Sequence, residues 1–332
     1  MGDTQEDKVH QAQKNEVFKA VAAKMWESFI RDSDFPEVKP TLAHYTSIDT
    51  LNSIVTNNEV WLSNPLYMND VEELRFGISE TTRAFYQSSS LRSACESEDR
   101  YNELCRAYAY VLKEFEEEHA FDIYITCLSE HTDADDDGRL SMWRGYGGNG
   151  KGAAIVFDTS KFHVVENSPL LIAKIHYGST EERLGWISAR VEELASCISS
   201  MKVPIDQLYW AVRAFFERMK IFSLFTKHKG FEEEREWRVA YLSYLDAEKK
   251  YHRFLGYAVG KTGIEPKLKL KFGQVDGVAE SGMSMENIVS KIILGPSVSS
   301  PLAVMSVRRM MQHLGRVELS ERIHGSTTPY RG

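Results

Sequence analysis

Hydrophobic and polar positions follow two different periods along this 332-residue chain. Apolar residues recur at helical spacing from Val17 to Ile30, which predicts an amphipathic helix after a polar, disordered start. Ser47 fits the N-cap of a second helix, whose apolar side ends at Val55. Short apolar runs bounded by turn residues predict strands. The expected strands are residues 42–46, 59–63, 122–129, 153–158, 171–177 and 287–295.

Helical spacing returns in two long segments between these strands. Residues 78–119 are expected to be mostly helical, and residues 180–226 to form two helices around Pro204. Pro301 and Gly315 fit the start and end of a later helix, and the RVELSERI segment after it is expected to be a last strand or a tail.

The sequence therefore predicts the α+β fold class. Its expected organisation is a disordered start and helix over residues 1–35, a single α+β domain over 36–325 with helical insertions near 78–119 and 180–226, and a tail over 326–332.

The segment from Phe231 to Tyr241, FEEEREWRVAY, concentrates charge on one side of an expected strand. Alternation places Trp237 and the following apolar positions on the buried face. The other face carries Glu232, Glu234, Glu236 and Arg238. Neighbouring carboxylates repel one another unless something positive lies across them, and a sugar cation that develops in a transition state is one candidate. A solvated face with a Glu236–Arg238 ion pair is the alternative.

Composition and charge narrow the classes of function. The net charge of -8 argues against a broad basic surface for nucleic acid, although a local basic groove is still compatible with it. The four cysteines have no metal-ligand spacing and are expected to be reduced thiols in a cytoplasmic protein. The polar N-terminus is no signal peptide, and no apolar run approaches the ~20 residues of a membrane span.

Two partial motifs do not support the chemistry that they suggest. GYGGNGKG, ending at Gly152, lacks the hydroxyl of a P-loop and precedes a strand, so we expect a tight turn. Asp133, Asp135 and Asp137 begin a calcium loop, but Arg144 stands where its bidentate glutamate belongs. The histidines include no H-E-x-x-H, and no metal is expected.

Polar and aromatic residues gather where the expected strands end, and side chains at such places often line a cleft. They are His44, Tyr45, Trp61, Ser63, Asn69, Trp143 and Tyr146. Each also has a structural explanation, as a hydrogen-bonded histidine, a core tryptophan or a loop residue.

Several segments together resemble a known family. They are LAHYTSIDTLNSIVTNNEVWLSNPLYMNDVEE, ITCLSE, SMWRGYGGNGKGAAIVFD, KHKGFEEEREWRV and KIILGP. Their order and spacing resemble domain-of-unknown-function family 2971 over about residues 40–300. That family in turn looks like a distant relative of ADP-ribosyltransferases, which bind NAD in a split antiparallel or mixed sheet. The chain departs from their pattern in having no Y-x-x-x-Y or S-T-S element.

The resemblance to ADP-ribosyltransferases implies a role for each residue. Glu236, or Glu234 as its partner, would be the catalytic carboxylate, and His44 would hold ribose or adenosine hydroxyls. Tyr45 or Trp61 would stack on the nicotinamide. The other residues of the implied NAD site are Ser63, Asn69, Trp143, Tyr146 and Arg238. Candidates for the diphosphate, by position, are Arg75, Arg144 and Lys151.

The implied activity is an NAD-dependent ADP-ribosyltransferase with NAD as substrate and a macromolecular acceptor, either RNA or DNA or protein. A bacterial toxin or phage-defence effector with a regulatory partner or antitoxin is the implied use. A noncatalytic module that binds a nucleotide or a partner in the same cleft is the first alternative. The second is a nucleic-acid-processing enzyme, because Lys267, Lys269 and Lys271 share one strand face that could follow phosphates. Those lysines also fit a solvated edge strand.

Overall fold

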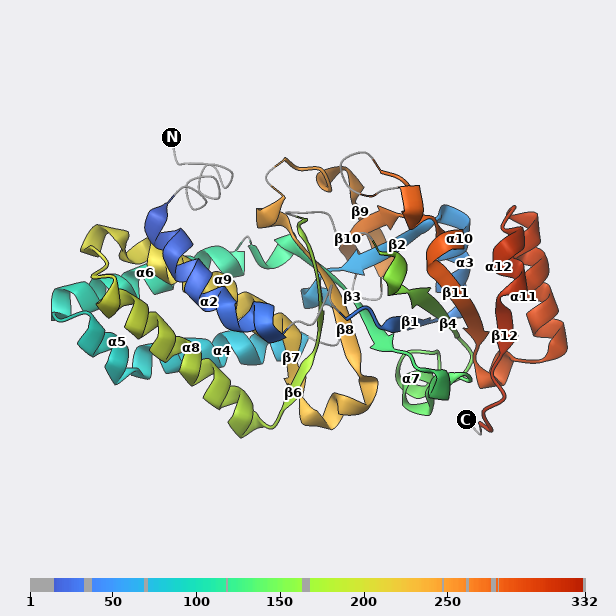
Figure 1. Cartoon of the computed structure of the whole chain (residues 1–332), viewed down its shortest axis with the longest axis horizontal. Helices are drawn as coiled ribbons and strands as arrows, with labels where there is room; N and C mark the ends of the chain where they lie inside the picture. Colours follow the sequence, from blue (N-terminus) through green and yellow to red (C-terminus); the bar gives the residue numbers. More distant parts are fainter. Residues whose placement is uncertain are drawn as a thin grey trace.

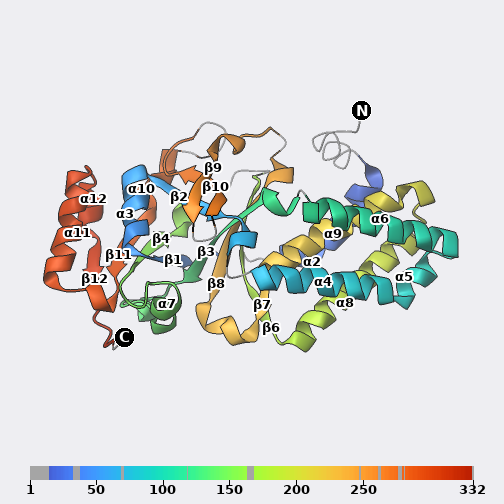
Figure 2. The ribbon, with the colours of Figure 1, turned by 180° about the vertical axis from the view of Figure 1, so that it is seen from behind.

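The computed structural model has a helical bundle at one end, a large sheet in the middle and two further helices at the opposite end (Figures 1 and 2). It describes residues 15–32, 38–68, 71–117, 119–162, 168–246, 248–260, 263–275, 279 and 281–330.

The bundle forms around one helix that is buried on all sides. Its members are α2 (Glu16–Asp32), α4 (Val71–Gln87), α5 (Ser89–Ala94), α6 (Glu98–Glu117), α8 (Thr180–Ser200) and α9 (Leu208–Phe225). Almost every residue of α9 is buried, and α2 packs against it through Val21 and Met25. Ser179 and Glu182 form a capping box at the start of α8. The predicted N-terminal helix and both predicted helical segments are confirmed.

The sheet has the strand order β12-β11-β4-β1-β3-β2-β10-β9, and β8 and β5 join it through β3. Its strands are β1 (Thr41–Thr46), β2 (Glu59–Ser63), β3 (Ile123–Glu130), β4 (Ala153–Asp158), β5 (Leu170–Lys174), β8 (Glu236–Leu242), β9 (Leu255–Gly260), β10 (Gly263–Lys271), β11 (Val289–Leu294) and β12 (Ile323–Gly325). All pairs in this sheet are antiparallel except β11 with β12. The predicted α+β class is confirmed.

Two expected strands differ from the observed ones. The run 171–177 is divided between β5 and a short strand β6 (His176–Gly178), which leaves the large sheet to pair with β7 (Thr226–His228). The RVELSERI segment is mainly a helix, α12 (Val317–Glu321), and only its last residue enters β12. A strand of three residues beside β11 was too short to show a period in the sequence.

Strand β3 is the branch point of the sheet. One of its edges pairs with β8 over residues 123–129. The opposite edge pairs with β1 only at Ser129 and Glu130, and with β2 only at Ile125. Within the described chain, residues 126–128 have no strand partner on that edge, so β1 and β2 diverge and open the sheet there.

Different helices cover the two faces of the sheet beyond this opening. One face packs on α3 (Ile48–Asn57), α10 (Met285–Ile288), α11 (Pro301–His313) and α12. The other face packs on α7 (Leu140–Gly145), where Trp143 is fully buried among Tyr45 and Val156. Helix α7 therefore lies beside the opening. It also places Tyr146, the residue that follows it, at the opening.

Candidate active site

A cavity of about 410 Å³ lies where β1 and β2 diverge. Most of the residues predicted from the sequence line it, although they come from four separate segments. They are His44, Tyr45, Trp61, Ser63, Tyr146, Glu234 and Glu236. Trp143 and Arg238 lie outside the cavity wall, and Asn69 lies outside the described residues. The volume is in the range of small-molecule sites.

The acidic segment is not one continuous strand, so that prediction was wrong. Lys229–Glu234 forms a 3-10 helix, which we call the acidic turn, and Arg235 is left-handed with φ 42° and ψ 51°. Strand β8 begins only at Glu236, which is opposite Ser129 of β3. The Arg235 carbonyl still accepts from the amide of Glu130, the last residue of β3, at 2.9 Å. The left-handed Arg235 then turns the preceding residues away from the ladder. Glu234 therefore does not share a strand face with Glu236, whereas Trp237 is buried against the core as predicted.

Glu236 is a buried carboxylate whose two oxygens are both occupied. Arg238 donates to them from Nε at 2.6 Å and from Nη2 at 3.2 Å, and Lys227 Nζ lies 3.2 Å from Oε2. Burial by itself raises the pKa of Glu236, but the charges and hydrogen bonds of Arg238 and Lys227 outweigh it and lower the pKa to about 2. Glu236 is therefore a carboxylate that stays charged. Its bonds to Arg238 and Lys227 limit the hydrogen bonds that it can form with a ligand.

Arg238 lies outside the cavity lining and is deeply buried. Only 1% of the residue is exposed, and its Nη1 donates to the main-chain oxygen of Leu224 in α9 at 2.7 Å. The guanidinium therefore joins Glu236 to the buried helix of the bundle. Since Arg238 is not part of the cavity lining, we assign it an indirect effect on a ligand, through Glu236.

Glu234 presents its carboxylate at the cavity wall from the end of the acidic turn. Tyr146 donates its hydroxyl to Oε1 at 2.8 Å, and Lys227 Nζ lies 2.7 Å from Oε2. The main-chain oxygen of Glu234 accepts from Ser129 Oγ at 2.6 Å, and Arg139 donates to the preceding carbonyl at 2.6 Å. The turn is therefore fixed to β3 and α7, which orients this carboxylate.

Lys227 was missed by sequence reasoning. It lies in β7, only 2% exposed, and its ammonium group bridges the Glu234 and Glu236 carboxylates. The same nitrogen lies 4.9 Å from the centre of the Phe231 ring. The only signal in the sequence was a basic residue between an apolar helix and an acidic run. Nothing in that pattern shows that the chain folds back to place it between the two carboxylates.

His44 takes the place of a strand at the open edge of β3. Its Nδ1 lies 3.2 Å from the main-chain oxygen of Cys127, in the gap between the β1 and β2 pairings. Burial lowers the pKa of His44, while the bond to Cys127 opposes this. A neutral ring that donates from Nδ1 keeps Nε2 as an acceptor, which suits a ligand hydroxyl.

Among the aromatic residues, Trp61 is the best placed to stack on a ligand. It is 37% exposed, and its Nε1 donates to Glu59 Oε1 at 2.8 Å. Tyr45 instead meets Trp143 edge-on, with ring centres 4.9 Å apart, and its hydroxyl accepts from the Arg139 amide at 2.9 Å. Trp143 is 0% exposed and belongs to the core that holds α7.

The cation at the cavity wall is not one of those expected by position. Arg75, Arg144 and Lys151 do not line the cavity, whereas Lys267 of β10 does. Its Nζ lies 2.9 Å from Ser63 Oγ and 2.9 Å from Glu265 Oε2. A positive group is therefore available on the β10 wall, on a different element from the two glutamates.

Aspartates of the partial calcium loop, residues 133–137, form contacts that stabilise the fold. Asp137 accepts from the amide and hydroxyl of Thr327 at 2.7 and 2.6 Å, and Asp136 pairs with Lys291 at 2.7 Å. Asp135 accepts from the amide and hydroxyl of Thr132. Among the residues that the structure describes, no three His, Cys, Asp or Glu side chains gather as metal ligands would.

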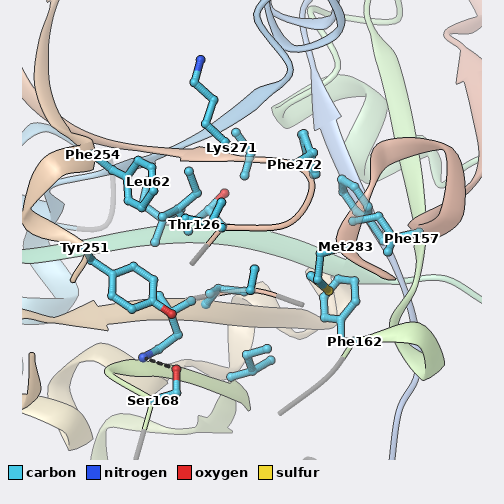
Figure 3. A pocket seen from close by; sticks show the side chains of 18 of the residues that line it. Leu62, Thr126, Phe157, Phe162, Ser168, Tyr251, Phe254, Lys271, Phe272 and Met283 are labelled. Carbon is cyan, nitrogen blue, oxygen red and sulfur yellow. Dashed lines mark hydrogen bonds between the residues drawn. The ribbon is translucent and has the colours of Figure 1, made fainter. Parts of the chain in front are cut away.

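A second cavity, of about 300 Å³, lies on the other face of the same strands (Figure 3). Its walls come from alternate residues such as Leu62 and Val239, and from aromatic rings such as Phe157 and Phe272. It shares Thr126 and Leu128 with the first cavity. Its walls are almost entirely apolar and contain no carboxylate, so the polar cavity is the candidate active site.

Comparison with known proteins identifies a family for this region. Residues 142–239 match the family described as protein of unknown function (DUF2971), which confirms the resemblance of the two motifs in that range, SMWRGYGGNGKGAAIVFD from Met142 onward and KHKGFEEEREWRV. The match includes Tyr146, Lys227, Glu234 and Glu236. Searches of curated proteins and of solved structures give no match. Within the described ranges, no helix combines the length and apolarity needed to cross a membrane.

The paired state of Glu236 predicts a loss of stability in acid. Its pKa is about 2 in the folded protein and 4.5 when unperturbed. Its contribution is therefore complete above about pH 4.5 and is lost as the pH falls toward about 2, by on the order of 3 kcal/mol. Urea denaturation at several pH values in this window measures the loss. Glu236→Gln should show a flatter dependence on pH, and equal slopes for both proteins would contradict the prediction.

Proposed function

We propose that this protein is an NAD-dependent ADP-ribosyltransferase that acts on a macromolecular acceptor. The observation that supports the proposal is the convergence of His44, Trp61 and Glu234 on one cavity at the opening of the sheet. An acceptor for hydroxyls, a stacking surface and a fixed carboxylate are the groups that this chemistry needs. NAD would be a substrate, and the chemistry asks for no metal ion.

The proposal assigns a separate role to each residue of the cavity. Tyr45, at the cavity wall, contacts the nicotinamide ring, and His44 Nε2 accepts a hydrogen bond from a ribose hydroxyl. The bond between C1′ and the ring nitrogen breaks, and its electron pair neutralises the pyridinium as nicotinamide leaves. Glu234 stabilises the oxocarbenium ion that develops at C1′. An acceptor O–H or N–H then bonds to C1′ and passes its proton to Glu234.

Purified protein with NAD labelled in its adenylate part tests the proposal. Cellular RNA, DNA and protein fractions are supplied separately as acceptors. We expect release of nicotinamide and transfer of label to one fraction. A protein that neither consumes NAD nor labels any fraction would refute the transferase.

A noncatalytic binding module is the second candidate, and one specific observation favours it. The carboxylates of Glu234 and Glu236 are balanced by Lys227 and Arg238 without any ligand. Such a network can serve purely to hold the cavity walls together. Calorimetry separates the two candidates, because tight NAD binding without turnover supports the module.

We extend the proposal to a cytoplasmic toxin or phage-defence effector. NAD and nucleic-acid acceptors are both present in the cytoplasm, and an enzyme that modifies them needs restraint. A regulatory partner or antitoxin is therefore part of the proposal.

A further inference from the structure

Three lysines form a row that leads out of the candidate active site. Lys267, Lys269 and Lys271 alternate along β10, and the register places them opposite Ser63, Trp61 and Glu59 of β2. Successive lysines are roughly 7 Å apart, so the row is roughly 13–14 Å long. Its inner end, Lys267, lines the polar cavity.

The simplest structural explanation of this row covers only part of it. Lysines often protect the edge strand of a sheet from pairing with other chains. Strand β10, however, lies between β2 and β9, and β9 is the edge. The pairing with β9 ends at Leu268, so of the three lysines Lys267 is paired on both sides, while Lys269 and Lys271 pair with β2 alone. Edge protection can account for the charges of Lys269 and Lys271, but it does not account for the exposed Trp61 ring beside them.

The middle of the row combines a cation with an exposed aromatic ring. Lys269 Nζ lies 4.6 Å from the centre of the Trp61 ring and donates to the Tyr257 carbonyl at 3.0 Å. Gly256 makes room for this arrangement, because a Cβ there would lie 3.2 Å from Lys269 Cε. Single-stranded nucleic acids are commonly held by aromatic rings that stack on bases between cations that attract phosphates.

The charges of the row do not cancel. Lys267 pairs with Glu265 at 2.9 Å, and Lys271 pairs with Glu59 at 2.6 Å. Lys269 contacts a carbonyl and a ring, so three cations face two carboxylates. This small positive excess contrasts with the net charge of -8 for the chain.

We propose that the acceptor is a single-stranded nucleic acid that lies along β10, with a base on Trp61 and phosphates at Lys269 and Lys271. The strand enters the cavity at Lys267, where it meets the carboxylate of Glu234. This inference rests on the proposed transferase, since it names the acceptor class for that site. An acidic protein segment would satisfy the lysines but would have nothing to stack on Trp61.

Fluorescence anisotropy with labelled RNA and DNA oligonucleotides of about twelve nucleotides tests the proposal. The double variant Lys269→Gln with Lys271→Gln should bind more weakly. Its plot of log affinity against log salt should be shallower by about 1.4, at about 0.7 for each phosphate that no longer meets a lysine. Lys269→Arg with Lys271→Arg should restore most of the affinity and slope. The matched control is Lys113→Gln, an exposed lysine on α6 in the bundle.

Trp61→Leu provides a second and independent measurement. It should weaken binding about tenfold with little change in the salt slope, because the variant removes the stacking of a base and leaves the phosphates paired. Thermal melts followed by circular dichroism check that each variant folds.

NAD is absent from these experiments, so they succeed or fail independently of turnover. The proposal is overturned if wild-type protein binds neither oligonucleotide, or if the lysine pair variant keeps wild-type affinity and slope. A polyglutamate peptide that displaces the labelled oligonucleotide as effectively as the unlabelled oligonucleotide does would also overturn it. If binding fails while NAD is still consumed, only the acceptor assignment falls.

Discussion

Glu234→Gln should lower the rate of NAD cleavage by roughly 10²–10³-fold, since a fixed charge that faces a developing ion contributes about that much. The variant keeps the size of the side chain, and its amide oxygen can still accept from Lys227 while its NH2 group donates to the Tyr146 hydroxyl. The ion pair with Lys227 is lost, but Glu236 still pairs with that ammonium group, so the fold should be preserved. Nicotinamide release measures the rate, and calorimetry measures NAD binding. Binding should change far less than the rate, because the interaction that the variant removes forms mainly in the transition state.

Glu233→Gln is the matched control for that experiment. Glu233 precedes Glu234 in the same acidic turn, and its side chain is exposed and outside the cavity wall. The substitution removes the same charge from the protein at a position that faces solvent. Equal losses in both variants, or full activity in Glu234→Gln, would contradict the assignment of Glu234.

Arg238→Met should lower the free energy of unfolding by about 3–5 kcal/mol, as expected when one partner of a buried ion pair is removed. Glu236 would keep its charge in the core with Lys227 as its remaining cation, and the hydrogen bond to the Leu224 carbonyl would no longer form. Urea denaturation measures the change. The double variant with Glu236→Gln should recover part of the stability, because it removes the unpaired charge as well.

Arg75→Met is the control for this stability experiment. Arg75 forms an ion pair with Glu72 on the surface of α4, where both side chains are more than half exposed. Its removal should cost no more than about 1 kcal/mol. If Arg238→Met is as stable as this control, the buried pair of Arg238 and Glu236 does not stabilise β8.

These two predictions separate the roles of neighbouring glutamates. The family resemblance implied catalysis by Glu236 or Glu234 and did not decide between them. The geometry favours Glu234 for our proposal. The Glu236 side chain is 5% exposed and is held by Arg238 and Lys227, whereas the Glu234 side chain is 15% exposed and is held by Tyr146 and Lys227. Glu236→Gln is therefore a poor inactive control, since it disturbs the fold as well as the site.

Elements with a strong local period could be predicted from the sequence. The runs around Leu42, Val60 and Ile155 became strands because each is short, apolar and bounded by turn residues. The helices around Pro204 followed from their spacing in the same way. Local patterns were sufficient where the structure depends on neighbours along the chain.

The candidate site was harder to predict because it depends on partners distant in the sequence. Strand β8 starts at Glu236 because Arg235 is left-handed, a conformation that is uncommon for arginine and that the local sequence pattern does not indicate. Trp61 and Trp143 both follow expected strands, yet one borders the cavity and the other fills the core. The same residue type in the same local pattern serves both purposes.

The imidazole of His44 has a structural role at Nδ1 and a proposed ligand-binding role at Nε2. Nδ1 of His44 completes the open edge of β3 at Cys127, and Nε2 is the acceptor that we assign to a ligand. Protonation would turn Nε2 into a donor and leave the hydrogen bond at Nδ1 in place. Acid would therefore reverse the direction of the hydrogen bond to a ligand hydroxyl, which can also accept, and would leave the contact with β3 in place. Since burial lowers the pKa of His44, the ring keeps its accepting form to a lower pH than an exposed histidine does.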